Sequence, residues 1–382
     1  MKRKILIYTL FIIWPFYFSI PVYSYDDTSF ENIYKEQIEI SGADNLEKQV
    51  PEETKESLNN IGVIGIDWDD ISNISPDKVF AEILNIAKKK SYKPLTSFSV
   101  IVSIIILCAL FDGMKTSFGS KPLSNVLGVV STLCICACVV APIVECINNL
   151  SSIIQNSSNF MLLYVPVITG IMISSGQTLS AGNYNFMMVI LGDTISQIVS
   201  RLLVPMLNMV LAVAVVSSIS SKLNLSGVSD MFNKVVKWIL KFIMAIFVSL
   251  LTIQTFVSTA ADNIGIRSIK FAINSFVPIV GGALSDAYTT VFSCLKLLKS
   301  GVGAFAILAS GFIFLPPIIE CFIWLFSLGV SASFSDIFGL MQISKMLRSS
   351  SKIVSTMLVI LLCIITILIV STGIVLTVGG GQ

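Results

Sequence analysis

The stretch Val139-Val140-Ala141-Pro142-Ile143-Val144-Glu145-Cys146-Ile147 decides the fold class of this chain, because it closes an apolar run that begins at Val126 and yet carries a carboxylate. About 20 apolar residues suffice for a helix to cross a bilayer. A charged side chain at bilayer depth costs about 2.5–3.5 kcal/mol, so it is usually paired, protonated, hydrated or functional. The stretch therefore predicts a membrane helix with one polar position that needs an explanation.

Nearly the same phrase returns far downstream as Pro317-Ile318-Ile319-Glu320-Cys321. Apolar residues flank Glu320 on both sides, which favours a buried functional or packing role. Glu145 lies close to Asn148 and Asn149, so its carboxylate can instead reach interfacial water. The two phrases indicate an internally repeated membrane fold.

The composition excludes a water-soluble globule. The 382 residues are 54% hydrophobic and 13% charged, with a mean hydropathy of +0.85, as expected of an all-α polytopic membrane protein in contact with the lipid bilayer. Of the 23 acidic residues, 15 lie between Tyr25 and Pro94. This asymmetry predicts a hydrated segment, 25–94, followed by a transmembrane helical domain, 95–382.

The first 24 residues read as a signal peptide. Lys2, Arg3 and Lys4 precede an apolar run that ends at Ile20, and Val22-Tyr23-Ser24 offers a cleavage site. An uncleaved first transmembrane helix is the alternative. A cleaved signal places the acidic segment outside the cytoplasm.

The acidic segment is predicted to form short helices. Ser75-Pro76-Asp77 is a helix start, with an N-cap, a proline at the first helical position and an acid near the positive end of the dipole. About 70 residues with few aromatics make a marginal core, so these helices need a partner, a membrane surface or the rest of the chain. A partly disordered leader is the alternative.

Charges, prolines and glycines cut the remaining chain into eight apolar blocks. The blocks are 95–111, 126–147, 160–174, 186–219, 242–257, 271–297, 302–330 and 353–378. Two of them, 186–219 and 302–330, exceed one ordinary crossing and are predicted to be broken helices or re-entrant hairpins. With such hairpins, the basic loops 112–125, 221–241, 296–301 and 345–352 all reach the cytoplasm.

A shift of 112 residues aligns Val165-Pro166-Val167-Ile168-Thr169-Gly170 with Val277-Pro278-Ile279-Val280-Gly281-Gly282, and Pro205 with Pro317. This register predicts a parallel internal repeat near 160–219 and 271–330. A chance match between apolar segments is the alternative. In this register Asn208 is the counterpart of Glu320, and Glu145 stands outside it.

Several residues inside the apolar blocks are candidate hinge or polar positions. A proline frees a backbone carbonyl and kinks a membrane helix; the candidates are Pro142, Pro166, Pro205, Pro278 and Pro317. Asp193, Gln197 and Arg201 are spaced to share one helix face, where they can act as a functional stripe or as a structural ion pair. Asp286 is a further acid within an expected span.

The sequence gives no sign of an enzyme. It has no histidine, and all eight cysteines lie in apolar segments, so neither metal nor disulfide chemistry is indicated. Cys134, Cys136 and Cys138 cannot converge on one ion from a helix. We therefore expect no cofactor, no metal, no catalytic residues and no nucleic-acid partner.

The chain as a whole resembles the stage III sporulation protein AE family. The resemblance rests on the signal sequence, on the apolar blocks, on the Pro-Ile-Val-Glu-Cys and Val-Pro-Val-Ile-Thr-Gly phrases, and on an acidic leader that contains Gly62-Val63-Ile64-Gly65-Ile66-Asp67-Trp68-Asp69-Asp70. The resemblance covers nearly the whole chain and carries no catalytic signature. It implies a multi-pass protein of the mother-cell membrane around the forespore of an endospore-forming bacterium. It also implies a subunit of a channel-like assembly, with other membrane subunits as partners and with homo-oligomers possible.

A secondary transporter is the alternative to a conduit subunit. In that interpretation Glu145, Glu320 and the stripe from Asp193 to Arg201 bind protons or solute near the bilayer midplane. The two functions differ in a testable way, since a transporter acts alone and a conduit subunit needs its partners.

Overall fold

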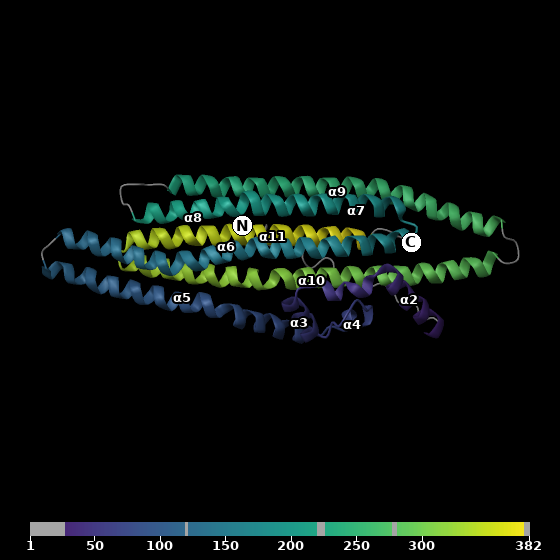
Figure 1. Ribbon diagram of the computed structural model, residues 1–382, viewed down its shortest axis with the longest axis horizontal. Coiled ribbons are helices and arrows are strands. Elements are labelled where there is room, and N and C mark those ends of the chain that lie inside the picture. The colour runs from purple at the N-terminus through teal and green to yellow at the C-terminus, as the bar shows by residue number, and fades with distance from the viewer. Residues whose placement is uncertain (1–26, 119–120, 220–225, 277–280, 378–382) are drawn as a thin grey trace.

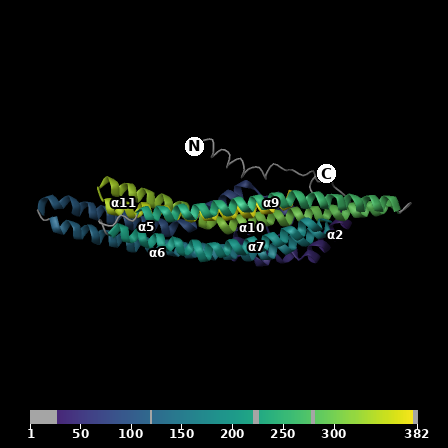
Figure 2. The same ribbon diagram turned by 90° about the horizontal axis from the view of Figure 1, so that it is seen from above.

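The computed structural model describes residues 27–118, 121–219, 226–276 and 281–377, and within these ranges the chain is helical throughout its regular structure. Figures 1 and 2 show the helices running along one long axis as an elongated bundle. The expected signal peptide, residues 1–24, lies outside the described residues.

The acidic segment begins with short helices between Asp27 and Ser72, which we call the leader. The leader packs on the bundle. Its elements are α2 (Asp27–Ser41), two 3-10 turns (Ala43–Asn45 and Glu47–Gln49), α3 (Glu52–Ile61) and α4 (Trp68–Ser72). These helices contact α10, and α3 also contacts α5. Figure 1 shows them beside α10 and the start of α5.

Long helices make the bundle itself. They are α5 (Pro76–Phe118), α6 (Lys121–Ser174), α7 (Thr178–Ile198), a π-helical turn (Val199–Leu203), α8 (Val204–Ile219), α9 (Ser226–Phe276), α10 (Gly281–Ile337) and α11 (Met341–Thr377). Helix α5 begins at the predicted Ser75-Pro76 start and continues through Pro94 without interruption.

Six helical segments among the described residues are long and apolar enough to cross a membrane. They are Pro76–Phe111, Thr132–Ser174, Thr178–Ser218, Asp230–Ile253, Thr289–Ile337 and Met341–Thr377. The chain is therefore a multi-pass membrane protein with six candidate spans, and the count of eight blocks is not confirmed. Blocks 126–147 and 160–174 lie in the single helix α6.

The prediction of re-entrant hairpins is wrong. Block 302–330 lies within the uninterrupted helix α10. Block 186–219 runs through α7, the π-helical turn and α8 without reversing direction. Both blocks exceed one crossing because these helices are longer than a bilayer is thick. Helix α10 alone has 57 residues, which extend about 85 Å at about 1.5 Å per residue, against a hydrocarbon core of about 30 Å.

The predicted internal repeat is not confirmed. Val165 and Pro166 lie inside α6, whereas the matching phrase begins just after α9 ends at Phe276. Four residues of that phrase, 277–280, lie outside the described residues, and Pro278 is among them.

Without hairpins, the four basic loops do not share one end of the bundle. The last turns of α5, α8 and α10 and the first turns of α6, α9 and α11 gather at one end, which we call the α5–α6 end (Figure 1). The last turns of α6 and α9 and the first turns of α7 and α10 lie toward the opposite end, which we call the α6–α7 end. Lys299 belongs to α10 toward this second end, where its Nζ donates to Gln177 Oε1 at 3.0 Å.

Two sets of hydrogen bonds stabilise the turn between α6 and α7: a C-cap at the end of α6 and a side-chain cap at the start of α7. Gly176 adopts φ +78°, and Gln177 N donates to Met172 O at 2.9 Å, which is the geometry of a Schellman C-cap. Helix α7 receives its N-cap from α9, since Asp262 accepts from Leu179 N at 3.0 Å and from Ser180 N at 2.9 Å.

Candidate functional site

The two Pro-Ile-X-Glu-Cys phrases, 175 residues apart in the chain, meet in the middle of the bundle. The Cys146 thiol of α6 donates to Glu320 Oε1 of α10 across 3.5 Å. Helices α6 and α10 run in opposite directions (Figure 1), so the cysteine of one phrase lies against the glutamate of the other. We call Glu145, Cys146, Glu320 and Cys321 the paired-phrase cluster.

Glu145 forms an ion pair with a lysine side chain of α5. Lys93 Nζ of α5 donates to Glu145 Oε1 at 2.6 Å, and both side chains are more than half exposed. The charge of Glu145 is therefore balanced by a lysine. The sequence placed Lys93 before the first span and gave no sign that α5 would carry it alongside Glu145.

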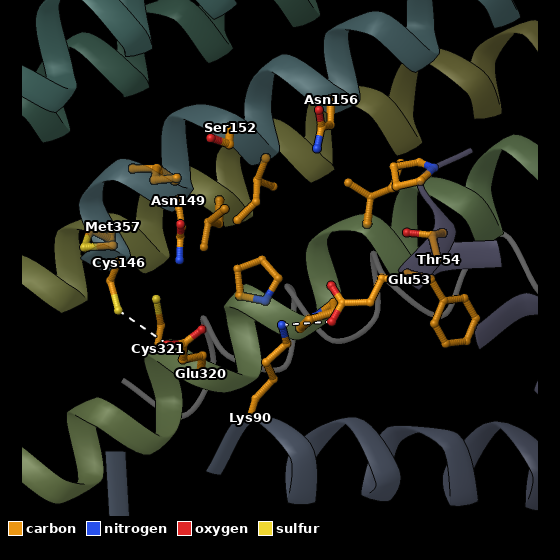
Figure 3. A pocket seen from close by; sticks show the side chains of 18 residues that line it. Glu53, Thr54, Lys90, Cys146, Asn149, Ser152, Asn156, Glu320, Cys321 and Met357 are labelled. Atoms are coloured by element: carbon orange, nitrogen blue, oxygen red, sulfur yellow. Dashed lines mark hydrogen bonds and ion pairs between the residues drawn. The ribbon is translucent and has the colours of Figure 1, made fainter. Parts of the chain in front are cut away.

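A cavity of about 250 Å³ opens beside this cluster. Figure 3 shows Cys146 and Glu320 at one side of it and Glu53 with Lys90 at another. Helix α6 contributes Asn149, Ser152 and Asn156 to its wall, and α11 contributes Met357. The cavity thus joins the acidic leader, through Glu53, to the core of the bundle.

An ion pair holds the leader side of the cavity. Lys90 Nζ of α5 donates to Glu53 Oε1 of α3 at 3.1 Å, and Lys89 Nζ lies 3.6 Å from the same oxygen. Partial burial raises the pKa of Glu53, but the hydrogen bonds and charges of Lys90 and Lys89 outweigh it and lower the pKa below its ordinary value. Glu53 therefore stays ionised at neutral pH.

Residues 148–159 of α6 are mostly polar and carry no charge, and in the sequence they separate two apolar blocks. The structure keeps them helical because neighbouring helices supply partners. Ser151 Oγ donates to Ser200 Oγ at 3.1 Å, and Ser196 Oγ donates to Gln155 Oε1 at 3.4 Å. A run of Asn, Ser and Gln at helical spacing between two apolar runs is the signal that could have predicted one long helix.

The other candidate residues lie apart from the cavity wall. Gln197 Nε2 donates to Asp193 Oδ2 at 2.6 Å on α7, and Arg201 follows on the π-helical turn. The side chain of Asp286, near the start of α10, is outside the described residues. Neither Asp193 nor Arg201 lines the cavity.

The prolines lie inside helices that remain continuous. Pro142 and Pro166 belong to α6, and Pro317 follows Pro316 inside α10. Pro205 is the second residue of α8, one residue after the π-helical turn, and the wider turn relieves the clash between the proline ring and the carbonyl four residues earlier. Pro316 and Pro317 also line the cavity.

Chemically, the cluster presents a carboxylate to a small cavity whose wall is largely apolar and includes a few polar side chains. A thiol is a weak donor, so the Cys146 bond leaves Glu320 with unused acceptor capacity. Among the described residues, no group of three His, Cys, Asp or Glu side chains is arranged to hold a metal ion. The arrangement suits a proton or a small hydrogen-bonding solute.

Comparison with known proteins assigns the family. The model of the stage III sporulation protein AE family matches residues 68–379. The chain belongs to this family. It is similar to the stage III sporulation protein AE of Bacillus subtilis (strain 168), with 22% identity over 203 residues, which is 53% of this chain and 51% of that protein. No solved structure matches the chain.

The matched region defines which features belong to the family portion of the chain. It begins at Trp68, so helices α2 and α3 precede it, while the paired-phrase cluster lies within it. The alignment with the Bacillus subtilis protein spans about half the length of that relative. Family membership and the six candidate spans are together consistent with a sporulation-related membrane protein.

The pairing of Lys93 with Glu145 predicts a charge-swap result. Lys93→Glu should lower the unfolding midpoint in detergent, because it sets a second carboxylate against Glu145. Lys93→Glu combined with Glu145→Lys should recover most of that loss, with a coupling of about 1 kcal/mol for an exposed pair. Additive effects of the two single substitutions in thermal unfolding would show that the pair does not interact.

Proposed function

We propose that this chain is a membrane subunit of a sporulation-specific, channel-like or secretion-like complex that links mother cell and forespore and is needed for late forespore development. The observation that carries the proposal is the docking of the acidic leader on the bundle of a protein in the stage III sporulation protein AE family. A leader held in place presents a fixed surface to partners.

The leader has the properties of a docking surface. Its inner face is apolar, with Leu58, Ile61, Val63 and Ile66 buried against the bundle. Its outer face is acidic and exposed, including Asp67, Asp69 and Asp70. Burial and the neighbouring charges of Asp70 and Asp69 raise the pKa of Asp67, as expected where acids crowd together. Such a face suits a partner subunit with a basic surface.

Positive residues favour one orientation of the bundle. Four helices have lysines near the α5–α6 end of the bundle: Lys115 in α5, Lys121 in α6, Lys234 in α9 and Lys345 in α11. By the positive-inside rule, that end faces the cytoplasm. The leader then faces the space between the mother-cell membrane and the forespore. The proposed location is thus the mother-cell membrane surrounding the forespore.

Co-purification from sporulating cells tests this function. The tagged chain should carry other membrane subunits with it, and Asp69→Asn with Asp70→Asn should reduce their yield at least fivefold without lowering the unfolding midpoint. Glu36→Gln with Glu39→Gln removes two exposed charges from α2 and serves as the matched control. Unchanged yields in the Asp69 and Asp70 variant would refute the docking surface; absence of any co-purifying subunit would refute the complex.

A secondary transporter is the second candidate, and the cavity beside Glu320 is the observation that favours it. A carboxylate with spare acceptor capacity between membrane helices can exchange a proton or bind a solute. Under this alternative, the purified protein alone should drive proton or solute flux in liposomes, and Glu320→Gln should abolish it. Flux that needs added partner subunits would instead favour the conduit.

A further inference from the structure

The first turns of α9 carry an exposed stripe of aromatic and basic side chains. Met231, Val235, Trp238 and Phe242 lie on one face of the helix, and Trp238 and Phe242 are 64% and 53% exposed. Their rings stack with centroids 5.6 Å apart and planes 8° from parallel. Lys234, Lys237 and Lys241 alternate with them and are also exposed. We call these seven residues the α9 stripe.

The orientation of the stripe is fixed by the opposite face of the same helix. Buried Asn233 accepts from Thr356 Oγ1 of α11 at 3.1 Å, and Val236 and Leu240 are buried in the bundle. Figure 1 shows α9 along one edge of the bundle. The stripe therefore points outward because the polar and apolar contacts on the inner face hold the helix in one rotation.

Charges near the stripe are only partly neutralised. Asp230 pairs with Lys352 at 2.8 Å, and Asp336 pairs with Arg348. Among the described residues, no carboxylate lies within ion-pair distance of Lys237 or Lys241. The outer surface of α9 thus offers positive charge to an anion that comes from outside the protein.

The stripe immediately precedes a lipid-compatible segment. Block 242–257 is apolar, and Ile246, Leu250, Ile253 and Val257 are exposed on it. Tryptophan and lysine at the start of an apolar run are the residues that settle at the boundary between headgroups and acyl chains. Clustered lysines beside such a boundary attract anionic lipids.

We propose that the α9 stripe is a binding site for anionic phospholipid headgroups in the bilayer. Lys234, Lys237 and Lys241 hold the phosphodiester, and Trp238 stacked on Phe242 occupies the glycerol and upper acyl region. The site requires a lipid in a membrane, since the aromatic half of the stripe has no role toward a soluble anion. This proposal is independent of the partners of the chain, and it also marks the level at which α9 meets the headgroups.

The test measures lipid selectivity at the surface of the full-length protein. The protein is reconstituted in phosphatidylcholine bilayers that contain trace spin-labelled phosphatidylglycerol or phosphatidylcholine, and electron spin resonance gives the relative association constant of the two lipids. The wild-type protein should prefer phosphatidylglycerol, and added salt should weaken that preference. Lys234→Gln, Lys237→Gln and Lys241→Gln together should reduce the preference at least fivefold.

Matched variants distinguish lipid binding at the α9 stripe from an attraction that depends only on the net charge of the protein. Lys48→Gln, Lys78→Gln and Lys88→Gln remove three exposed lysines from the leader and the start of α5, and this control should keep the wild-type preference. Lys234→Arg, Lys237→Arg and Lys241→Arg together should keep it as well, because they retain the positive charge, and the glutamine variant should keep the wild-type unfolding midpoint in detergent, which would show that it folds. Equal loss in the control, retained preference in the glutamine variant, or displacement of the lipid by millimolar inorganic phosphate would each overturn the proposal.

Discussion

Gly301→Ala is expected to detach the leader from the bundle. A Cβ at Gly301 would overlap the carbonyl oxygen of Ile66 and stand 3.6 Å from Trp68 N, so the added methyl meets backbone on both sides of Asp67 and no side-chain rotation relieves it. Overpacking of this kind costs about 1–3 kcal/mol. The cost falls on the contact between the leader and α10, because α10 itself tolerates alanine well.

Hydrogen exchange of residues 52–72 measures this result. Protection in α3 and α4 should fall about tenfold or more, while protection in α11 stays unchanged. Gly311→Ala is the control, since it lies on the same helix and a Cβ there meets nothing within 4 Å. If residues 52–72 are equally protected from exchange in the two variants, the close approach at Gly301 does not hold the leader on the bundle.

Asp262→Ala is expected to destabilise the α6–α7 end of the bundle. Asp262 is 5% exposed, and its two carboxylate oxygens accept from Leu179 N and Ser180 N at the start of α7. Alanine leaves these amides without an acceptor and removes a negative charge from the positive end of the helix dipole. We expect a loss of about 2–4 kcal/mol in the free energy of unfolding.

The loss should be measured as a lower midpoint of thermal unfolding in detergent. Asp193→Ala is the matched control: its carboxylate is exposed and bound to Gln197 on the same helix, so its removal should cost about 0.5 kcal/mol or less. Asp262→Asn should fall between the two, because one amide oxygen can replace only one of the two acceptors. Equal midpoints for Asp262→Ala and Asp193→Ala would contradict the capping role.

Local sequence signals were sufficient for the class of the fold and for several of its boundaries. Apolar composition predicted a helical membrane protein, and the capping signal at Ser75-Pro76 marked the start of α5. These features depend on neighbouring residues, which a sequence displays directly. The family resemblance, confirmed by the match to residues 68–379, rested on diffuse phrases spread over the whole chain.

Helix continuity and long-range pairing could not be predicted in the same way. The Asn, Ser and Gln residues of 148–159 separated two apolar blocks in the sequence because their partners, such as Ser196 and Ser200, lie elsewhere in the chain. The same limit applies to the paired-phrase cluster: the 112-residue register set Glu145 apart from Glu320, yet antiparallel packing of α6 and α10 brings Cys146 to Glu320. Sequence similarity between the phrases did not encode their contact.

The length of α6 gives the protein mechanical leverage. A helix of 54 residues is about 80 Å long, so a tilt of the whole helix by about 10° about one end corresponds to a displacement of about 14 Å at the other. A small reorientation of α6 at the α5–α6 end thus corresponds to a large sideways displacement of its α6–α7 end.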